Sequence, residues 1–214
     1  MRQSPLALGV LTGVLLGAGV AALVFALAGA ERPAVKPLAS ISRTPAPEPA
    51  PSDPTPRKAD FAGRVAGGLV ALSIRNGRAV GYFCDGRRET WMKGTARGNV
   101  ASLSGGKDKS WTLEARLRDG RATGRLGAGD DTWAFTAPVV KKPSGLYRAT
   151  REVRGSKIVG GWIVLPGGRQ VGAVSFDGVA EPAPRLTPGR DVTTYGITLR
   201  PEAVDAFFEG MADG

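Results

Sequence analysis

The segment "SWTLEARLRDGRATGRLGAGDDTW", residues 110–133, gives the strongest indication of the fold. Its first half alternates apolar with polar residues, and a period of two indicates a strand with one buried face. Asp119-Gly120 follows, and this pair suits a two-residue type I′ turn, in which both residues adopt a positive φ. Such a turn fixes a register with one apolar and one polar face. The predicted pairs are Leu113 with Leu126, Ala115 with Gly124, Leu117 with Ala122, Glu114 with Arg125 and Arg116 with Thr123.

The segment "LVALSIRNGRAVGYFC", residues 69–84, predicts a second hairpin of this kind around Asn76-Gly77. Both of its faces carry apolar or small residues. This indicates a hairpin that is covered on two sides, by the preceding linker or by the C-terminal segment. The predicted pairs are Leu69 with Cys84, Val70 with Phe83, Ala71 with Tyr82, Leu72 with Gly81, Ser73 with Val80 and Ile74 with Ala79.

Further hairpins are predicted along the rest of the chain, one of them turning at residues 166–168. The C-terminal segment predicts a short helix, because Pro201 suits the first position of a helix and an apolar stripe at helical spacing follows it. The stripe consists of Val204, Phe207, Phe208 and Met211. The sequence therefore predicts an all-β fold, a meander of hairpins that forms a small barrel or sandwich, with a short C-terminal helix.

The chain divides into four predicted regions. Residues 1–30 form an N-terminal transmembrane helix or signal peptide, 31–60 a Pro-rich stalk, 61–200 the β-domain, and 201–214 the short helix and tail. The uncharged residues 6–30 exceed the roughly 20 that a helix needs to cross a bilayer. A cleaved signal peptide remains the alternative, because small residues that resemble cleavage sites end the apolar run.

The stalk bears on where the β-domain lies. Half of the 16 prolines in the chain fall in residues 31–58, and such a segment favours extended polyproline II over a helix or a sheet. A spacer of this kind suits a cell envelope, so we expect a single-pass membrane protein with its β-domain outside the cytoplasm. Counting Arg32, Lys36 and Arg43 by the positive-inside rule favours the opposite orientation. A linker without a positional role is a further alternative.

Composition excludes several enzyme classes. The chain has no histidine, so the commonest general base and most zinc chemistry are missing. Its single cysteine, Cys84, cannot form an intrachain disulfide, and its predicted place at a strand end indicates a small buried hydrophobic residue. A reactive thiol with its pKa lowered by Arg87 and Arg88 is the alternative. We expect no enzyme activity, no cofactor and no metal. Chemistry with Asp, Glu or Tyr is the remaining enzymatic possibility.

Three tryptophans recur after a hydroxyl residue, at Trp91, Trp111 and Trp133. Strands one hairpin apart run in the same direction, so the three rings are expected at similar height. One interpretation is a core layer at the mouth of a small barrel. The other is an aromatic platform that binds a sugar or a lipid, because an indole offers a broad apolar face with one donor.

Positive charge concentrates in the predicted β-domain. The chain carries 29 Lys and Arg against 19 Asp and Glu, and residues 64–169 contain 20 basic and 8 acidic residues. The polar face of the first hairpin carries Arg116, Arg118, Arg121 and Arg125. Such a surface attracts an anionic envelope polymer, lipid head groups or an acidic protein. No nucleic-acid motif accompanies it, so nucleic acid is not an expected partner. A merely solvated surface is the alternative.

The run "YFCDGRRETWMKG", followed by "GLYRA" and "GGWIVLPGGRQVG", resembles a bacterial family of membrane-anchored or secreted β-domain proteins of unknown function. The resemblance spans most of residues 64–178, and it implies an envelope location without supplying an activity or site residues. The predicted function is an envelope binding or sensing module without catalytic activity. The alternative is a structural domain that docks on a partner membrane protein through its basic surface.

Overall fold

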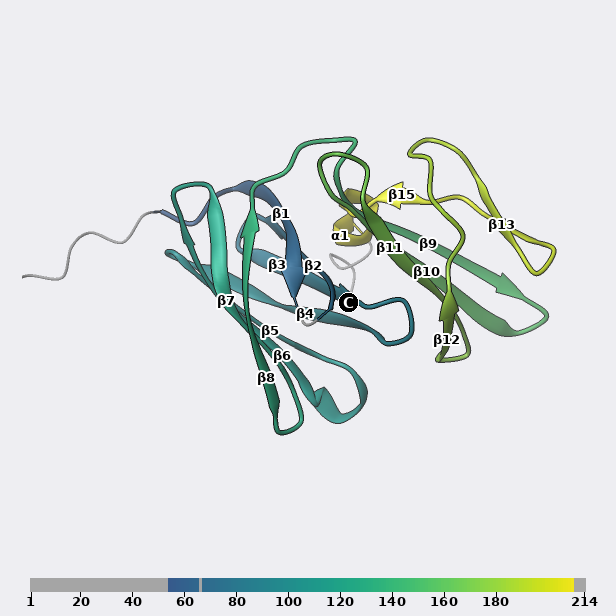
Figure 1. Cartoon of the computed structure of the whole chain (residues 1–214), viewed down its shortest axis with the longest axis horizontal. Helices are drawn as coiled ribbons and strands as arrows, with labels where there is room; N and C mark the ends of the chain where they lie inside the picture. The colour runs from purple at the N-terminus through teal and green to yellow at the C-terminus, as the bar shows by residue number, and fades with distance from the viewer. Residues whose placement is uncertain (1–53, 66, 210–214) are drawn as a thin grey trace, which may run out of the picture. The chain divides into compact units, whose positions relative to one another are not determined.

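The computed structural model describes residues 54–65 and 67–209 (Figure 1). The predicted anchor and most of the predicted stalk therefore lie outside the described residues. Within the described ranges, no helix has both the length and the apolar character that crossing a bilayer requires.

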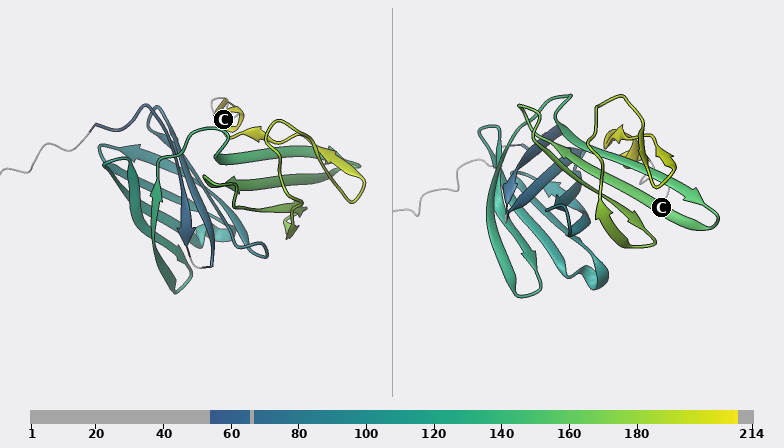
Figure 2. Two further views of the ribbon diagram at one scale, coloured as in Figure 1. Left: turned by 45° about the horizontal axis from the view of Figure 1, so that its top comes forward. Right: turned by 45° about the vertical axis from the view of Figure 1, so that its right-hand side comes forward.

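Eight antiparallel strands form a closed barrel in which each strand pairs with the next along the chain and β8 pairs with β1 (Figures 1 and 2). The closure decides between the barrel and the sandwich that the sequence left open. The strands are β1 (Lys58–Val65), β2 (Gly68–Arg75), β3 (Arg78–Cys84), β4 (Glu89–Arg97), β5 (Val100–Gly105), β6 (Trp111–Arg118), β7 (Arg121–Ala128) and β8 (Asp131–Pro138). A short 3-10 turn, Lys107–Lys109, joins β5 to β6.

Both predicted hairpin registers are confirmed. In β6–β7, Leu113 lies opposite Leu126, and every other predicted pair is found as well. The turn residues Asp119 and Gly120 have φ values of 50° and 68°, as a type I′ turn requires. In β2–β3, all six predicted pairs are also found.

Along each barrel strand every second side chain faces inward, and these side chains fill the barrel interior. Leu72, Phe83, Met92, Leu113 and Leu126 are all completely buried there. The backbones of β6 and β7 approach each other closely at Gly124, since a Cβ there would lie 1.8 Å from the carbonyl oxygen of Glu114. Glycine permits this close approach of two backbones, which a small closed barrel needs at its corners.

A five-stranded antiparallel sheet follows the barrel, in the order β12-β11-β10-β9-β15. Its strands are β9 (Gly145–Val153), β10 (Ser156–Val164), β11 (Gln170–Phe176), β12 (Val179–Pro182) and β15 (Glu202–Ala203). A small hairpin, β13 (Val192–Thr194) and β14 (Ile197–Leu199), precedes β15, and the helix α1 (Asp205–Glu209) follows it. Figure 2 shows this sheet beside the barrel, with the helix α1 near the boundary between the two and the β13–β14 hairpin farther from the barrel.

One face of the five-stranded sheet packs on the outside of the β2–β3 hairpin. The second hydrophobic cluster joins outward-facing barrel residues to residues of β9, β10, β11 and the C-terminal segment. The barrel side contributes Leu69, Ala71, Val80, Tyr82 and Cys84, and the other side Leu146, Ile163, Ala173, Val204 and Phe208. This confirms that the hairpin is covered on two sides, and the C-terminal segment supplies part of the cover.

The other face of the sheet is covered by the chain between β12 and β15. Trp162 is almost completely buried there with Leu186 and Leu199, and its indole N–H donates to the carbonyl of Pro184 at 3.0 Å. Gln170 holds the covering segment, because its side chain both donates to and accepts from the backbone of Leu186. The sheet is therefore buried on both of its faces.

The C-terminal helix begins later than the sequence predicts. Pro201 is buried and precedes β15, whereas the helix starts at Asp205, because residues 202 and 203 pair with β9 before the chain turns. Arg75 fixes the start of the helix. Its Nε donates to Asp205 at 2.6 Å, and its Nη2 donates to both carboxylate oxygens of Asp60 at 2.9 Å.

Candidate functional site

Cys84 lies in the buried layer between the barrel and the five-stranded sheet, as a small hydrophobic residue would. Burial raises the pKa of its thiol to about 11, and the sulfur accepts a hydrogen bond from the Gly86 N–H at 3.4 Å. The neighbouring Arg88 is paired with Asp85 at 2.9 Å and does not form the cationic setting of a reactive thiol. The predicted burial of Cys84 is confirmed.

The three predicted tryptophans do not form one layer. Trp111 and Trp133 lie against the barrel core with ring centroids 6.5 Å apart, and Trp111 stacks on Phe83. Trp91 lies outside the barrel, because Met92 occupies the inward position of β4. Trp111 and Trp133 therefore lie together, whereas Trp91 lies on the other side of the barrel wall and belongs to a different cluster.

The four predicted arginines, Arg116, Arg118, Arg121 and Arg125, lie on the outer surface of β6–β7 and are all exposed. We call this surface the arginine wall. Arg118 lies opposite Arg121, and Arg116 lies opposite Thr123. Within the part of the chain that the structure describes, none of the four makes an ion pair. Arg125 lies opposite Glu114, an exposed acidic residue, so the two strands carry four arginines against one carboxylate on this surface. The wall therefore keeps a net positive charge.

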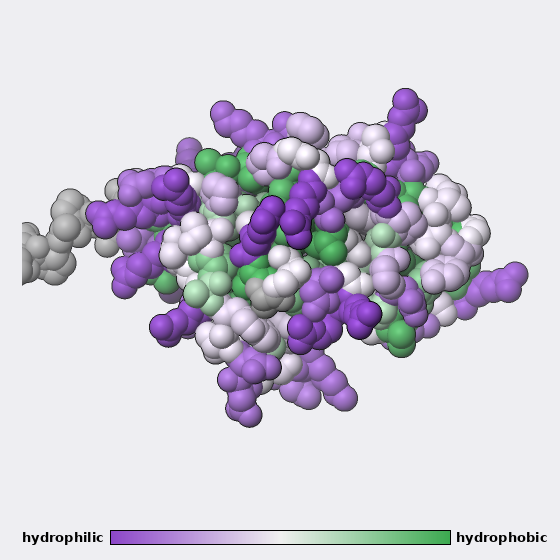
Figure 3. Space-filling model, in the orientation of Figure 1, coloured by the Kyte–Doolittle hydropathy of each residue, from purple (hydrophilic) through white to green (hydrophobic). Residues whose placement is uncertain are grey.

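A shallow hollow of about 310 Å³ lies within the arginine wall. It is lined by Arg116 and Arg125, by the acidic Glu114, and by Val100, Ala115, Thr123 and Gly124. The exposed outward positions of the flanking strands are mostly small or hydroxylated. They are Ser102 on β5 and Thr132, Ala134 and Thr136 on β8. The four arginine side chains are therefore longer than most of the exposed side chains beside them. Figure 3 shows hydrophilic side chains projecting from the surface of the molecule.

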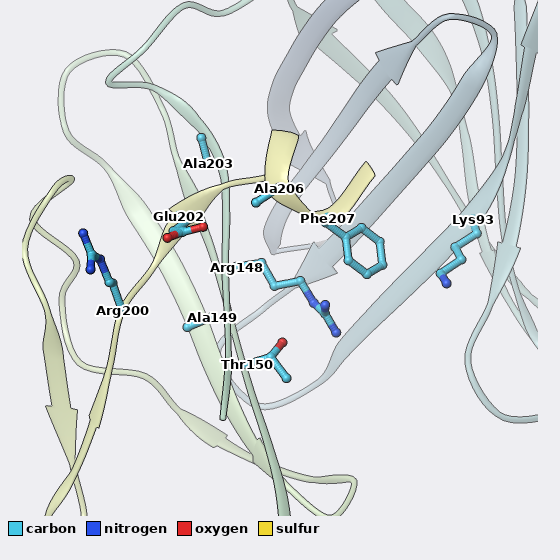
Figure 4. A pocket seen from close by; sticks show the side chains of 9 residues that line it. All are labelled: Lys93, Arg148, Ala149, Thr150, Arg200, Glu202, Ala203, Ala206 and Phe207. Carbon is cyan, nitrogen blue, oxygen red and sulfur yellow. The ribbon is translucent and has the colours of Figure 1, made fainter. Parts of the chain in front are cut away.

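The structure also forms a groove that the sequence analysis did not predict. Two cavities of about 460 Å³ each adjoin one another, and both are lined by Lys93 of β4, Arg148 of β9 and Phe207 of α1. Figure 4 shows Arg148 extending from β9 toward the space beside Phe207 and Lys93. We use the name Arg148 groove for the groove that Lys93, Arg148, Phe207 and Trp91 line.

Aromatic rings hold the guanidinium of Arg148 in place. Its Cζ lies 4.2 Å from the ring centroid of Phe207 and 5.1 Å from that of Trp91. The ammonium of Lys93 lies 5.1 Å from the same Phe207 ring. Such contacts stabilise a cation and restrict the orientation of a guanidinium. Two cations therefore share one ring at the mouth of the groove.

Arg148 is only partly satisfied by its surroundings. Its Nε is buried and has no hydrogen-bond partner among the described residues, and the indole N–H of Trp91 is in the same situation. Burial lowers the pKa of Arg148, while the nearby Glu89 carboxylate acts in the opposite direction. No carboxylate within the described ranges lies within ion-pair distance of the guanidinium.

Glu89 is bonded elsewhere, to the buried Tyr82. The Tyr82 hydroxyl donates to Glu89 at 2.5 Å and lies 3.3 Å from the carbonyl oxygen of Gly161. Burial raises the pKa of both groups, although the Tyr82 hydrogen bond and Arg148 act to lower that of Glu89. Glu89 thus lines one cavity of the groove, but its carboxylate already accepts a hydrogen bond from Tyr82.

Local sequence gives little sign of the groove. Trp91 and Lys93 share a strand face at a spacing of two, which was the one detectable signal. In the sequence, Arg148 looks like any other polar residue of a strand. Phe207 was predicted only as part of the apolar stripe of the C-terminal helix. The three segments are distant in sequence, so the groove follows from tertiary packing.

Comparison with known proteins returns no relative. No family model, no curated protein and no solved structure matches the chain. The resemblance to a bacterial envelope family stays a prediction. Among the described residues, no group of three or more His, Cys, Asp or Glu side chains is arranged to hold a metal ion. Function must therefore be inferred from the surfaces of the molecule.

Proposed function

We propose that the β-domain is a binding module of the cell envelope without catalytic activity, and that its arginine wall binds an anionic envelope polymer. In this proposal the N-terminal segment anchors the protein and the domain lies outside the cytoplasm. The observation that supports it most is the group of four exposed arginines without an ion-pair partner in the described ranges.

The spacing of the arginines suits a ligand with repeated charges. Arg116 and Arg118 occupy alternate positions of one strand, and such positions are roughly 6 to 7 Å apart. Arg121 and Arg125 belong to the adjacent strand, which extends the charged area sideways. Guanidinium groups bind phosphate oxygens through two parallel hydrogen bonds, so a polymer with phosphate groups fits this surface best.

The affinity of such a surface should depend strongly on salt, because exposed charges are screened over about 8 Å at physiological ionic strength. The hollow between Arg116 and Arg125 leaves space for one charged group of the polymer, whose attraction to the two arginines must exceed its repulsion by Glu114. The small side chains of β8 leave room for the rest of the polymer. A folded acidic protein would need a complementary shape over the same area.

The test uses the full-length protein in detergent and a soluble polyphosphate as the probe. The variant with Arg118→Gln and Arg121→Gln removes two charges, and the variant with Arg87→Gln and Arg190→Gln removes two exposed charges elsewhere. We expect roughly tenfold weaker binding at low salt for the first pair, if each exposed charge contributes on the order of 0.7 kcal/mol. The control pair should bind almost as the unmodified protein does.

Three results would contradict the proposal. They are equal losses in both pairs, binding that does not change with salt, and binding of an acidic protein but of no polymer. The last result would favour the docking domain. The location has a separate test, because protease added to cells with a permeable wall should cleave an exported stalk. Protection until the membrane is lysed would reverse the topology.

A further inference from the structure

We propose that the Arg148 groove is a second binding site, separate from the arginine wall, for a small organic oxyanion. In this site the carboxylate or phosphate group of the ligand lies between Arg148 and Lys93, and its apolar part contacts Phe207. The juxtaposition of two cations at one aromatic ring, beside an open cavity, supports the proposal.

The electrostatic state of Arg148 favours an anion. A half-buried guanidinium loses hydration, and this loss is normally offset by a carboxylate or by a full set of hydrogen bonds. Among the described residues, the Nε of Arg148 lacks a hydrogen-bond partner and its guanidinium forms no ion pair, although the Glu89 carboxylate lies near enough to offset part of the charge. Lys93 adds a second positive charge at the same ring. An oxyanion between them would replace mutual repulsion by attraction.

The orientation of the guanidinium is already fixed before a ligand binds. Contact with the faces of Phe207 and Trp91 restricts its plane, so little conformational entropy remains to be lost. A planar guanidinium held in this way matches the two oxygens of a carboxylate or phosphate. Lysine in its place would keep the charge and lose this geometry.

The two cavities differ in charge, and the difference indicates where the ligand lies. The cavity drawn in Figure 4 has Lys93, Arg148 and Arg200 against the single acid Glu202. The adjoining cavity has Lys93, Arg148 and Lys157 against both Glu89 and Asp177. An anion is therefore more stable in the first cavity. Its volume of about 460 Å³ falls in the range of small-molecule sites.

The experiment measures binding of phenyl phosphate and benzoate to the full-length protein by calorimetry, with benzyl alcohol as the neutral probe. The two oxyanions separate a phosphate ligand from a carboxylate ligand. The Trp91 indole N–H is recorded by nuclear magnetic resonance and assigned with Trp91→Phe, because it lies beside Arg148 and has no partner in the described ranges. We expect at least one oxyanion to bind and to shift this signal.

Variants locate the site. Arg148→Gln should weaken oxyanion binding at least tenfold, and Arg148→Lys should restore only part of the affinity because the planar fork is missing. Lys93→Gln changes an exposed side chain and should weaken binding several-fold, so it tests the site even if an Arg148 variant unfolds. Lys109→Gln, in the β5–β6 connection, is the matched control and should have no effect.

The arginine-wall pair, Arg118→Gln with Arg121→Gln, should leave oxyanion binding in the groove unchanged. This separates a failure of the second site from a failure of the first. The inference is overturned if neither oxyanion binds at millimolar concentration, or if benzyl alcohol binds equally well. It is also overturned if Lys93→Gln and folded Arg148 variants bind as the unmodified protein does.

Discussion

Replacement of Arg75 by glutamine would remove the contact that joins α1 to the barrel. The Arg75 side chain is 11% exposed, whereas those of Asp60 and Asp205 are 26% and 29% exposed. The variant leaves two mostly buried carboxylates without this cation. We expect the free energy of unfolding to fall by about 2 to 3 kcal/mol, between the values for an exposed pair and for a fully buried one.

The stabilisation that comes from the pair of Arg75 and Asp205 should also depend on pH. Burial alone would raise the pKa of Asp205, but hydrogen bonds and charge from Arg75 and Lys58 outweigh it and lower the pKa. A carboxylate whose pKa is lower in the folded state stabilises the fold above its unfolded pKa of about 3.9. This contribution is lost as the pH falls through the folded pKa. The energetic coupling of Arg75 to Asp205 should therefore be full at pH 7 and fade in acid.

The assay is urea-induced unfolding of the full-length protein in detergent, followed by tryptophan fluorescence. A double-mutant cycle with Arg75→Gln and Asp205→Asn, measured at neutral and at acid pH, isolates their coupling from the contacts of Asp205 with Lys58 and Lys142. Arg97→Gln, an exposed change on β4, is the control. The reasoning is refuted by a loss below about 0.5 kcal/mol for Arg75→Gln. A coupling that stays constant from neutral to acid pH would also refute it.

Two further predictions concern the barrel and its outer layer. Cys84 should react slowly with a thiol reagent in the folded protein and rapidly after unfolding, and Cys84→Ala should cost about 1 to 2 kcal/mol of stability. Rapid labelling of the folded protein would show that the thiol is accessible. Gly124→Ala should cost more stability than Gly81→Ala in the same urea assay. An added Cβ meets backbone at 1.8 Å in the first case, and only side-chain ends at 3.3 Å or more in the second. Equal losses would mean that the β6–β7 corner can relax.

The hairpin registers were predictable because the residues that determine them are close together in the sequence. Asp119-Gly120 and Asn76-Gly77 each specify a two-residue turn, and the turn then fixes every pair along the strands. The apolar character of both faces of 69–84 also indicated a double cover, although the segments that provide it are far away in sequence.

Features that depend on distant segments were not predictable in this way. Closure of the barrel pairs Arg64 with Thr136, and no local pattern specifies that contact. Strand direction predicts only the height of Trp91, whereas the side of the barrel wall on which it lies depends on which residues of β4 face inward. The Arg148 groove was missed for the same reason, since Lys93, Arg148 and Phe207 meet only through packing.

The β2–β3 hairpin belongs to two hydrophobic cores at once, with Leu72 and Phe83 facing inward and Ala71 and Tyr82 facing outward. Unfolding of the five-stranded sheet would uncover the outward set, so that sheet and the barrel should lose structure in one cooperative transition. An isolated barrel fragment would expose this apolar strip to water and tend to associate with other copies. We therefore expect the barrel and the second sheet to fold as one unit.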